Sequence, residues 1–306
     1  MPKIKENIIT IILTHNEEKN ISKAIKSANK VSNIVYVVDS FSDDKTINIA
    51  KKLNAKILKK KFKNHSEQFN WALNKIHPKE KWVLRLDADE YLEDSLINEI
   101  NIKMNYLKKD VNGITFKLKE KFLDKFIRFG GRRNLRILRL WKYGFGKIEN
   151  RLMDEGVYLF SGRIKHFSNY IVNDNSKDIN QYILKHQSYA SKEAIEVIDK
   201  KYNILKKNSR KNFNIDTKRK IKLFIKNRIY YNLPYPISSS LYFIFRYFIL
   251  LGFLDGKIGF IYHFIQGYWY RVMVGEKVDQ IEKSIKKVKS NKKIKKIIYS
   301  LTNLKI

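Results

Sequence analysis

The sequence predicts an α/β protein with a mostly parallel central sheet, followed by a helical C-terminal region. Short apolar runs, typical of buried strands, alternate with longer segments of helical character up to about residue 120. Polar residues follow these runs directly, as they do where parallel strands end at a ligand-binding edge. Beyond residue 200 the chain becomes strongly basic and aromatic, which indicates a second region of different character.

Four strands are expected at 8–13, 34–38, 55–58 and 82–86, because each is a short apolar run bounded by polar residues. Helices are expected between and after them, ending near residue 30, then at about 42–53, 66–76 and 94–104. Strands and helices that alternate at this spacing are typical of βαβ units, with helices on both faces of the sheet.

The later part of the chain is less regular. Residues 113–119 alternate like an edge or antiparallel strand, and a long helix is expected over about 177–208. We therefore expect one domain at 1–200, made of two halves at about 1–120 and 121–200. The helical, basic region would then occupy residues 201–306.

Composition limits the possible partners and chemistry. The 306 residues contain 63 Lys and Arg against 30 Asp and Glu, a net charge of +33. The partners should therefore be anionic: a phosphate-bearing substrate, a membrane surface or nucleic acid. The absence of cysteine excludes disulfides, thiol catalysis and zinc–thiolate sites. The chain begins with no signal-peptide pattern, so we expect the catalytic part to lie in the cytoplasm.

Polar side chains follow three of the predicted strands. They are Thr14, Asn16 and Glu17 after the first strand, Asp39 after the second, and Asp87 and Asp89 after the fourth. In a parallel sheet these groups converge at one edge. Two carboxylates one residue apart suit a Mg²⁺ or Mn²⁺ ion that is shared with a diphosphate. No P-loop motif occurs and no glycine-rich dinucleotide loop follows the first strand, which leaves a nucleotide held by side chains and a metal.

Three motifs together resemble glycosyltransferase family 2 in their order and spacing. They are IILTHNEEKNI at 11–21, VVDSFSDDKT at 37–46 and LDADE at 86–90. Later stretches at 131–133, 136–141, 144–156, 165–167 and 267–271 are similar to a bacterial branch that includes lipopolysaccharide-core glucosyltransferases. The resemblance implies the A-type glycosyltransferase fold, a single Rossmann-like nucleotide-sugar-binding domain. It also implies inverting transfer of a hexose from a nucleotide sugar, such as UDP-glucose, to a lipid-anchored glycan. Residues 1–200 would then be the catalytic domain, with a donor half at about 1–120 and an acceptor half at about 121–200.

The resemblance also implies roles for the strand-end residues. Thr14 and Glu17, with Asn16 between them, would line the nucleotide pocket. Asp39 would accept a hydrogen bond from the uracil ring. Asp87 would hold the ribose or a metal-bound water, and Asp89 would ligate the Mg²⁺ or Mn²⁺ ion.

Other residues are assigned to the diphosphate, the acceptor and proton transfer. Arg132, Arg133 and Arg136 are candidates for contacts with the donor diphosphate or a phosphorylated acceptor, and His166 for contact with the acceptor or diphosphate. The preferred base is Glu149, and the alternatives are Asp154 and Glu155. By contrast, Glu90 and Glu93 are expected to be solvated loop acids, and a solvated helix face is the default for Glu67, Gln68 and Asn70.

The C-terminal region and the acceptor leave alternatives open. Residues 237–254 are apolar for about the length of a short membrane span, but Arg246 interrupts them. Interfacial attachment is favoured over a buried helical cap and over a true span, because tyrosines, Trp269 and many lysines flank the run. We expect a peripheral enzyme on the cytoplasmic face of the inner membrane, with lipopolysaccharide core as the favoured acceptor.

Three rival interpretations follow. Within the same class, the acceptor would be a polyprenyl-linked capsule or O-antigen intermediate. From other classes, the protein would be a nucleotidyltransferase or a basic nucleic-acid-binding protein. No DNA or RNA module pattern is present, so a nucleic-acid partner is not expected.

Overall fold

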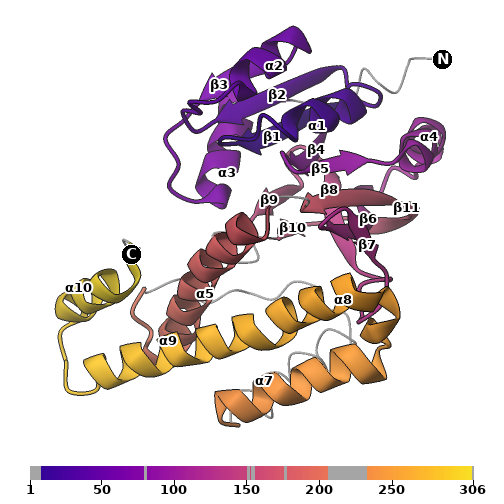
Figure 1. Cartoon of the computed structure of the whole chain (residues 1–306). Helices are drawn as coiled ribbons and strands as arrows, with labels where there is room; N and C mark the ends of the chain where they lie inside the picture. Colours follow the sequence, from indigo (N-terminus) through magenta and orange to yellow (C-terminus); the bar gives the residue numbers. More distant parts are fainter. Residues whose placement is uncertain are drawn as a thin grey trace. The chain divides into compact units, whose positions relative to one another are not determined.

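The computed structural model describes residues 8–78, 81–149, 152, 156–175, 178–205 and 233–304. The chain divides into two compact units, whose elements are labelled in Figure 1. The first unit comprises Met1–Arg128 and Arg132–Ser176. The second comprises Lys177–Ile306 together with the short segment Phe129–Gly131.

The first unit is built around one large sheet. Its strands are β1 Ile8–Thr14, β2 Ile34–Asp39, β3 Lys56–Lys59, β4 Trp82–Asp87, β5 Glu90–Leu92, β6 Val111–Phe122, β7 Lys125–Ile127, β8 Arg136–Lys142 and β11 Arg163–Asn175. Within the described residues they follow the order β3-β2-β1-β4-β8-β6-β11-β5, and β7 pairs with β6. Two further strands, β9 Gly146–Ile148 and β10 Val157–Leu159, pair with each other.

Helices cover both faces of this sheet, as predicted. They are α1 Ile21–Ala28, α2 Thr46–Lys52, α3 His65–Ile76 and α4 Asp94–Lys103, which continues as the short 3-10 turn η2 Met104–Tyr106. Successive residues of a strand point to opposite faces. In β1, Ile8 and Ile12 therefore join the core formed with α1, α2 and α4. Ile9 and Ile11 join a second core, in which Phe69 of α3 is buried.

The sheet is mixed, which corrects the expectation of a mostly parallel sheet. Strands β1 to β4 are parallel as predicted. However, β8 is antiparallel to both β4 and β6, and β5 is antiparallel to β11. A parallel connection needs a long crossover, usually a helix, and only the small strand β7 separates β6 from β8. The strand expected at 113–119 as an edge or antiparallel strand is β6, which is antiparallel to β8 and lies inside the sheet rather than at its edge.

The second unit is helical (Figure 1). Its elements are α5 Ile179–Tyr202, α7 Tyr235–Ile244, the π-helical turn η4 Phe245–Ile249, the 3-10 turn η5 Gly252–Asp255, α8 Gly256–His263, the π-helical turn η6 Phe264–Trp269, α9 Tyr270–Ile285 and α10 Asn291–Thr302. Helix α5, expected in the catalytic domain, groups with this unit and packs on α9 through Ala190, Tyr270 and Val274.

None of the described helices is by itself long and apolar enough to cross a membrane. The pair Tyr235–Ile249 and Gly252–Ile285 reaches that length and composition only jointly, and the two members are bent by 71° at the break between them.

The segment Phe129–Gly131 is held by the second unit through backbone contacts. The Arg246 guanidinium donates from Nε to the Gly130 carbonyl at 3.0 Å. The Phe129 N–H donates to Asp255 Oδ2 at 2.9 Å, and the Gly130 N–H donates to the Leu250 carbonyl at 2.9 Å. Gly130 has a φ of +65°, and the buried His263 ring occupies the space in which its side chain would lie. This position therefore requires glycine for two independent reasons.

A matched pair of glycine substitutions separates these reasons. Gly256 has nearly the same φ, +66°, but nothing lies within 4 Å of where its Cβ would be. We expect Gly256→Ala to lower the free energy of unfolding by about 1–3 kcal/mol through backbone strain alone, because its φ of +66° and ψ of −152° lie in a region that side chains other than glycine rarely adopt. Gly130→Ala should cost about 1–3 kcal/mol more, because its methyl overlaps the His263 ring. Urea unfolding of both variants measures the difference, and equal losses would contradict the packing of His263 on Gly130.

Candidate active site

The polar groups that end three neighbouring strands lie at one edge of the sheet. Thr14 of β1 pairs with Asp39 of β2. On the other side of β1, Leu13 pairs with Asp87 of β4. Thr14, Asp39 and Asp87 are the last residues of their strands. Because the three strands are parallel, their carboxyl ends lie on the same side of the sheet, with adjacent strands about 4.8 Å apart. The structure therefore brings Thr14, Asp39 and Asp87 together, and Asp89 follows two residues beyond Asp87.

The loop after β1 is joined to the loop after β2 by hydrogen bonds. Asn16 adopts a φ of +53°. Its side-chain oxygen accepts from the Asp43 N–H at 3.1 Å, and its own N–H donates to Ser42 Oγ at 2.9 Å. The Glu17 N–H donates to Thr46 Oγ1 at 2.8 Å. These bonds fix the backbone of the first polar loop, so Asn16 has a structural role in shaping the edge.

Two buried polar side chains line this part of the edge. The Thr14 hydroxyl is buried, and within the described residues it has no hydrogen-bond partner. A buried hydroxyl without a partner costs free energy unless a ligand or water satisfies it. Asp39 is also buried, and its carboxylate accepts from the Ser42 hydroxyl at 2.5 Å and from the Ser42 N–H at 3.1 Å. A carboxylate has about four acceptor positions, so Asp39 can still accept from a ligand.

Gln68 and Asn70 were expected on a solvated helix face, but the structure places them in contact with the candidate site. Gln68 is buried, and its amide donates to Ser40 Oγ at 2.8 Å, next to Asp39. The Asn70 amide donates to the Ile148 carbonyl at 3.2 Å and accepts from the Ile148 N–H at 3.4 Å. Helix α3 thus fixes the segment that immediately precedes the predicted base, Glu149.

A cluster of charged groups surrounds Asp87. Arg139, in β8, donates from Nη2 to Asp87 Oδ2 at 2.9 Å and to Glu90 Oε1 at 2.5 Å. Arg85, in β4, approaches Asp87 Oδ1 with its Nε at 3.3 Å. Glu90 Oε2 accepts from the Asp87 N–H at 3.1 Å. Asp87 is therefore held by arginines on both carboxylate oxygens, and Glu90 shares one of these arginines.

The shared arginine separates the pKa values of the two carboxyls. Burial alone would raise the pKa of Asp87, but Arg139 and Arg85 outweigh it and hold that pKa well below its usual range. Burial raises the pKa of Glu90 to about 7, because attraction to Arg139 does not compensate for desolvation and for repulsion by Asp87. The two carboxylates in turn raise the pKa of Arg139 despite its burial, so this guanidinium stays charged.

Three residues of this cluster, Arg85, Glu90 and Arg139, have no assigned role in the sequence analysis. Glu90 was expected to be a solvated acid, yet only 3% of it is exposed. Its partner is 49 residues away in the chain, which no local pattern reveals. The available signal was Arg139 itself, a cation between two leucines in an apolar strand. Glu93 is closer to expectation, because it is partly exposed and pairs with Lys119 at 2.5 Å.

The acidic groups at this edge fit a divalent ion only in part. Among the described residues, no three His, Asp or Glu side chains are grouped so that they could hold a metal. The donors at the edge are the partly exposed carboxylates of Asp87 and Asp89. A Mg²⁺ ion usually takes one or two carboxylates and completes its shell with water and substrate phosphates. This donor set therefore fits an ion that arrives with, or is completed by, a diphosphate.

The predicted arginines and His166 lie in the second half of the sheet. The pairing of Leu84 with Leu140 places Arg136 level with the end of β4. Its Nη1 donates to the Phe167 carbonyl at 2.6 Å, although much of the side chain is exposed. His166 is exposed, and its Nδ1 lies 2.6 Å from Thr115 Oγ1. Arg133 is exposed and Arg132 is half-buried.

The three candidate bases differ in what the structure describes. Glu149 directly follows β9 and is half-buried, and its N–H donates to the Gly156 carbonyl at 3.0 Å. Asp154 and Glu155 lie outside the described residues. The choice among the three stays a prediction.

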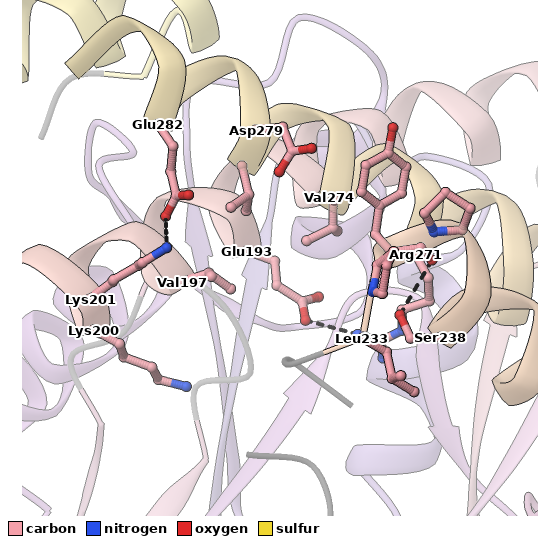
Figure 2. A pocket seen from close by; sticks show the side chains of 15 residues that line it. Glu193, Val197, Lys200, Lys201, Leu233, Ser238, Arg271, Val274, Asp279 and Glu282 are labelled. Atoms are coloured by element: carbon pink, nitrogen blue, oxygen red, sulfur yellow. Dashed lines mark hydrogen bonds and ion pairs between the residues drawn. The ribbon is translucent and has the colours of Figure 1, made fainter. Parts of the chain in front are cut away.

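The second unit contains a separate cavity of about 660 Å³ between α5, the start of α7 and α9 (Figure 2). Two ion pairs cross it: Glu193 Oε1 to Arg271 Nη1 at 2.9 Å, and Lys201 Nζ to Glu282 Oε1 at 2.5 Å. None of its lining residues is among the predicted site residues. The cavity is thus bordered by contacts that join α5 to α9, and the candidate active site lies in the first unit.

The raised pKa of Glu90 predicts a pH dependence of stability. Between about pH 4.5 and 7 the folded chain keeps a proton on Glu90 that the unfolded chain has lost. The free energy of unfolding should therefore fall as the pH rises through this range, by at most about 3 kcal/mol. Glu90→Gln should remove this fall. Urea unfolding at several pH values measures it, with the partly exposed Glu93→Gln as the control that keeps the fall. An unchanged slope in Glu90→Gln would contradict the raised pKa.

Comparison with known proteins connects this edge to a family. The sequence model of Glycosyl transferase family 2 matches residues 9–165, just over half of the chain. An uncharacterized glycosyltransferase of Rickettsia typhi is 40% identical over 95 residues, which are 31% of this chain and 32% of the relative. One of Rickettsia prowazekii is 38% identical over 95 residues, with the same two coverages of 31% and 32%. The match thus spans about a third of the length of these curated relatives.

A solved structure extends the likeness in fold to most of the chain. The mannosyltransferase PcManGT from Pyrobaculum calidifontis superposes with a TM-score of 0.53 and 13% identity, over 89% of this chain and 86% of its own. At this identity the likeness concerns the fold alone. The matched family region contains every strand end that builds the candidate site. The chain belongs to glycosyltransferase family 2.

Proposed function

We propose that the protein is an inverting hexosyltransferase that uses a UDP-linked sugar such as UDP-glucose, a divalent metal and a lipid-anchored glycan acceptor. The observation that carries the proposal is the joint position of Thr14, Asp39 and Asp87 at the carboxyl edge of β1, β2 and β4. Membership in the family supports a sugar-transfer reaction. The Pyrobaculum mannosyltransferase was solved with GDP-mannose and Mn²⁺, which supports a nucleotide-sugar donor and a divalent ion.

Each group at the edge has a role in holding the donor. Asp39 would accept the uracil N–H, and the unsatisfied Thr14 hydroxyl would bond to the nucleotide. Asp87 is kept ionised and oriented by Arg139 and Arg85, so it can accept from a ribose hydroxyl or a metal-bound water. Asp89 would ligate the ion. When bound, that ion would neutralise the diphosphate as it leaves, which is where charge develops in the transition state.

Transfer would proceed by a single displacement. The acceptor oxygen forms a bond to the anomeric carbon while the bond from that carbon to the diphosphate oxygen breaks, which inverts the configuration. The acceptor proton moves to a carboxylate, and Glu149 is the preferred one. Arg132, Arg133 and Arg136 supply positive charge for the leaving diphosphate or a phosphorylated acceptor, and His166 is a further candidate for contact with either.

Charge and composition support the proposed location, whereas the choice of acceptor rests on the resemblance of the later stretches to the lipopolysaccharide-core branch. The net charge of +33 favours an anionic surface, and the helical unit is rich in exposed lysines. We propose that the enzyme acts at the cytoplasmic face of the inner membrane, with lipopolysaccharide core as the favoured acceptor. A polyprenyl-linked capsule or O-antigen intermediate is the alternative within the same reaction class.

Calorimetric titration with UDP, with and without Mn²⁺, tests the donor site. We expect binding that requires the metal and is lost in Asp89→Asn, whose transfer activity should fall about a thousandfold, because such an ion contributes several kcal/mol. Asp94→Asn, at the exposed start of α4, is the control that should bind normally. Metal-dependent binding of GDP instead of UDP would overturn only the identity of the nucleobase in the proposed donor. Failure to bind any nucleoside diphosphate, with salt-sensitive binding of oligonucleotides, would favour the nucleic-acid interpretation.

Three conservative substitutions test the base. Glu149→Gln should leave UDP binding intact and lower the rate of transfer about 10²–10⁴-fold, the usual contribution of a general base. Asp154→Asn and Glu155→Gln should retain most of the activity. The initial rate of transfer to a lipid-linked glycan, together with the UDP titration, measures both effects. If the loss occurs in Asp154→Asn or Glu155→Gln instead, Glu149 is not the base.

A further inference from the structure

One surface of the helical unit is apolar and exposed over a long stretch. Between residues 237 and 264, eleven large apolar side chains are 40–66% exposed. We call them the hairpin face: Ile237, Leu241, Ile244, Phe245, Phe248, Ile249, Leu251, Phe253, Leu254, Phe260 and Phe264. They come from α7, η4, η5, α8 and the start of η6, on both sides of the bend. Exposed apolar surface of this extent usually marks a site of interaction.

Several polar side chains of the same stretch are buried or bonded to the segment Phe129–Gly131. Arg246 is 5% exposed and donates to the Gly130 carbonyl, and His263 is fully buried against Gly130. Asp255 accepts from the Phe129 N–H, and Ser239 is buried. In the range 237–264, all of which the structure describes, Lys257 is the single exposed charged side chain. This stretch therefore has polar groups inside and apolar groups outside, the reverse of a water-facing helix pair.

The bent helix pair Tyr235–Ile249 and Gly252–Ile285, which we call the hairpin, has a geometry that suits one leaflet of a bilayer. Its two helical arms reach the length and composition of a membrane span only together, and they are bent by 71°. An apolar helix that does not cross the bilayer is stable at the boundary between headgroups and acyl chains. At that depth the long stem of Lys257 allows its ammonium group to reach the headgroups.

Charge complementarity distinguishes a lipid surface from a protein partner. The end of α9, the following turn and α10 carry a set of exposed lysines in the same unit: Lys283, Lys286, Lys287, Lys289, Lys292, Lys293 and Lys296. An uncharged apolar face in a unit with many exposed cations matches a leaflet that has an apolar interior and anionic headgroups. A protein partner would need a rim of specific polar contacts around its apolar core, whereas Lys257 is the single exposed charged side chain in the range 237–264 that carries the hairpin face.

We propose that the hairpin face inserts into the headgroup–acyl boundary of an anionic phospholipid leaflet. This deepens the proposed function, since it names the surface through which an enzyme with a lipid-anchored acceptor meets its membrane. The same hairpin binds Phe129–Gly131 on its inner side, and Arg132 and Arg133 follow in the sequence. Insertion therefore presents its apolar side to lipid without breaking the contacts that hold this segment.

The absence of cysteine allows a direct test on the full-length chain. A single cysteine is introduced as Phe248→Cys, on the hairpin face, and labelled with a polarity-sensitive dye. Leu184→Cys is the matched control, because Leu184 is an exposed leucine of α5 in the same unit. Vesicles of three parts phosphatidylcholine to one part phosphatidylglycerol should shift the dye emission to the blue at position 248 and leave it unchanged at 184.

Two results would overturn the proposal. The first is vesicle binding without a blue shift at position 248, which would mean that only the exposed lysines attach the protein to the vesicles. The second is a blue shift at 248 that rises with protein concentration in the absence of vesicles, which would assign the face to a second copy of the chain.

Flotation with the same vesicles provides an independent measurement. The double substitution Ile244→Ser with Phe248→Ser should weaken vesicle binding more than tenfold, while Leu184→Ser should not change it. Unchanged flotation of the double variant would overturn the proposal. Titration with UDP and Mn²⁺ on each variant keeps the two proposals distinguishable. If no variant binds nucleotide but the lipid responses hold, the proposed function fails and the hairpin proposal stands.

Discussion

The candidate site depends on the ion pairs that Arg139 forms with the carboxylates of Asp87 and Glu90. An ionised carboxylate is costly to remove from water unless a cation and hydrogen bonds compensate. Arg139 supplies both to Asp87, at 2.9 Å, and it also binds Glu90, at 2.5 Å, whose burial it offsets only in part. It also joins β8, which is antiparallel to β4, to both β4 and β5. One guanidinium therefore orients the Asp-x-Asp motif and connects the parallel half of the sheet to the mixed half.

The two units bury opposite kinds of side chain. In the first unit, apolar side chains fill cores on both faces of the sheet, and polar groups collect where strands end. In the hairpin of the second unit, Arg246, Asp255 and His263 face inward and hold a glycine-containing segment, while phenylalanines and leucines face outward. The first arrangement is that of a domain in water. The second leaves large apolar side chains exposed to water, and the proposed insertion into a lipid leaflet would cover them.

Much of the first unit was predictable because its signals are local. The runs at 8–13, 34–38 and 82–86 became β1, β2 and β4 to within one residue, and helices α3 and α4 began and ended within one residue of expectation. Strand β5, of three residues, was too short to show a period. The antiparallel course of β8 was not predictable either, because strand direction depends on the connection rather than on side-chain alternation.

By itself, the sequence determined the alternating strands and helices, the family, and the residues that end β1, β2 and β4. These follow from short-range periodicity and from motifs whose spacing is preserved in the chain. Only the tertiary structure decided that Glu90 is buried, that Arg139 is its partner, and that the polar side of the hairpin faces Gly130. Each of these contacts joins residues 49 or more positions apart. Burial and charge pairing at such separations are properties of the folded chain, and no local pattern contains them.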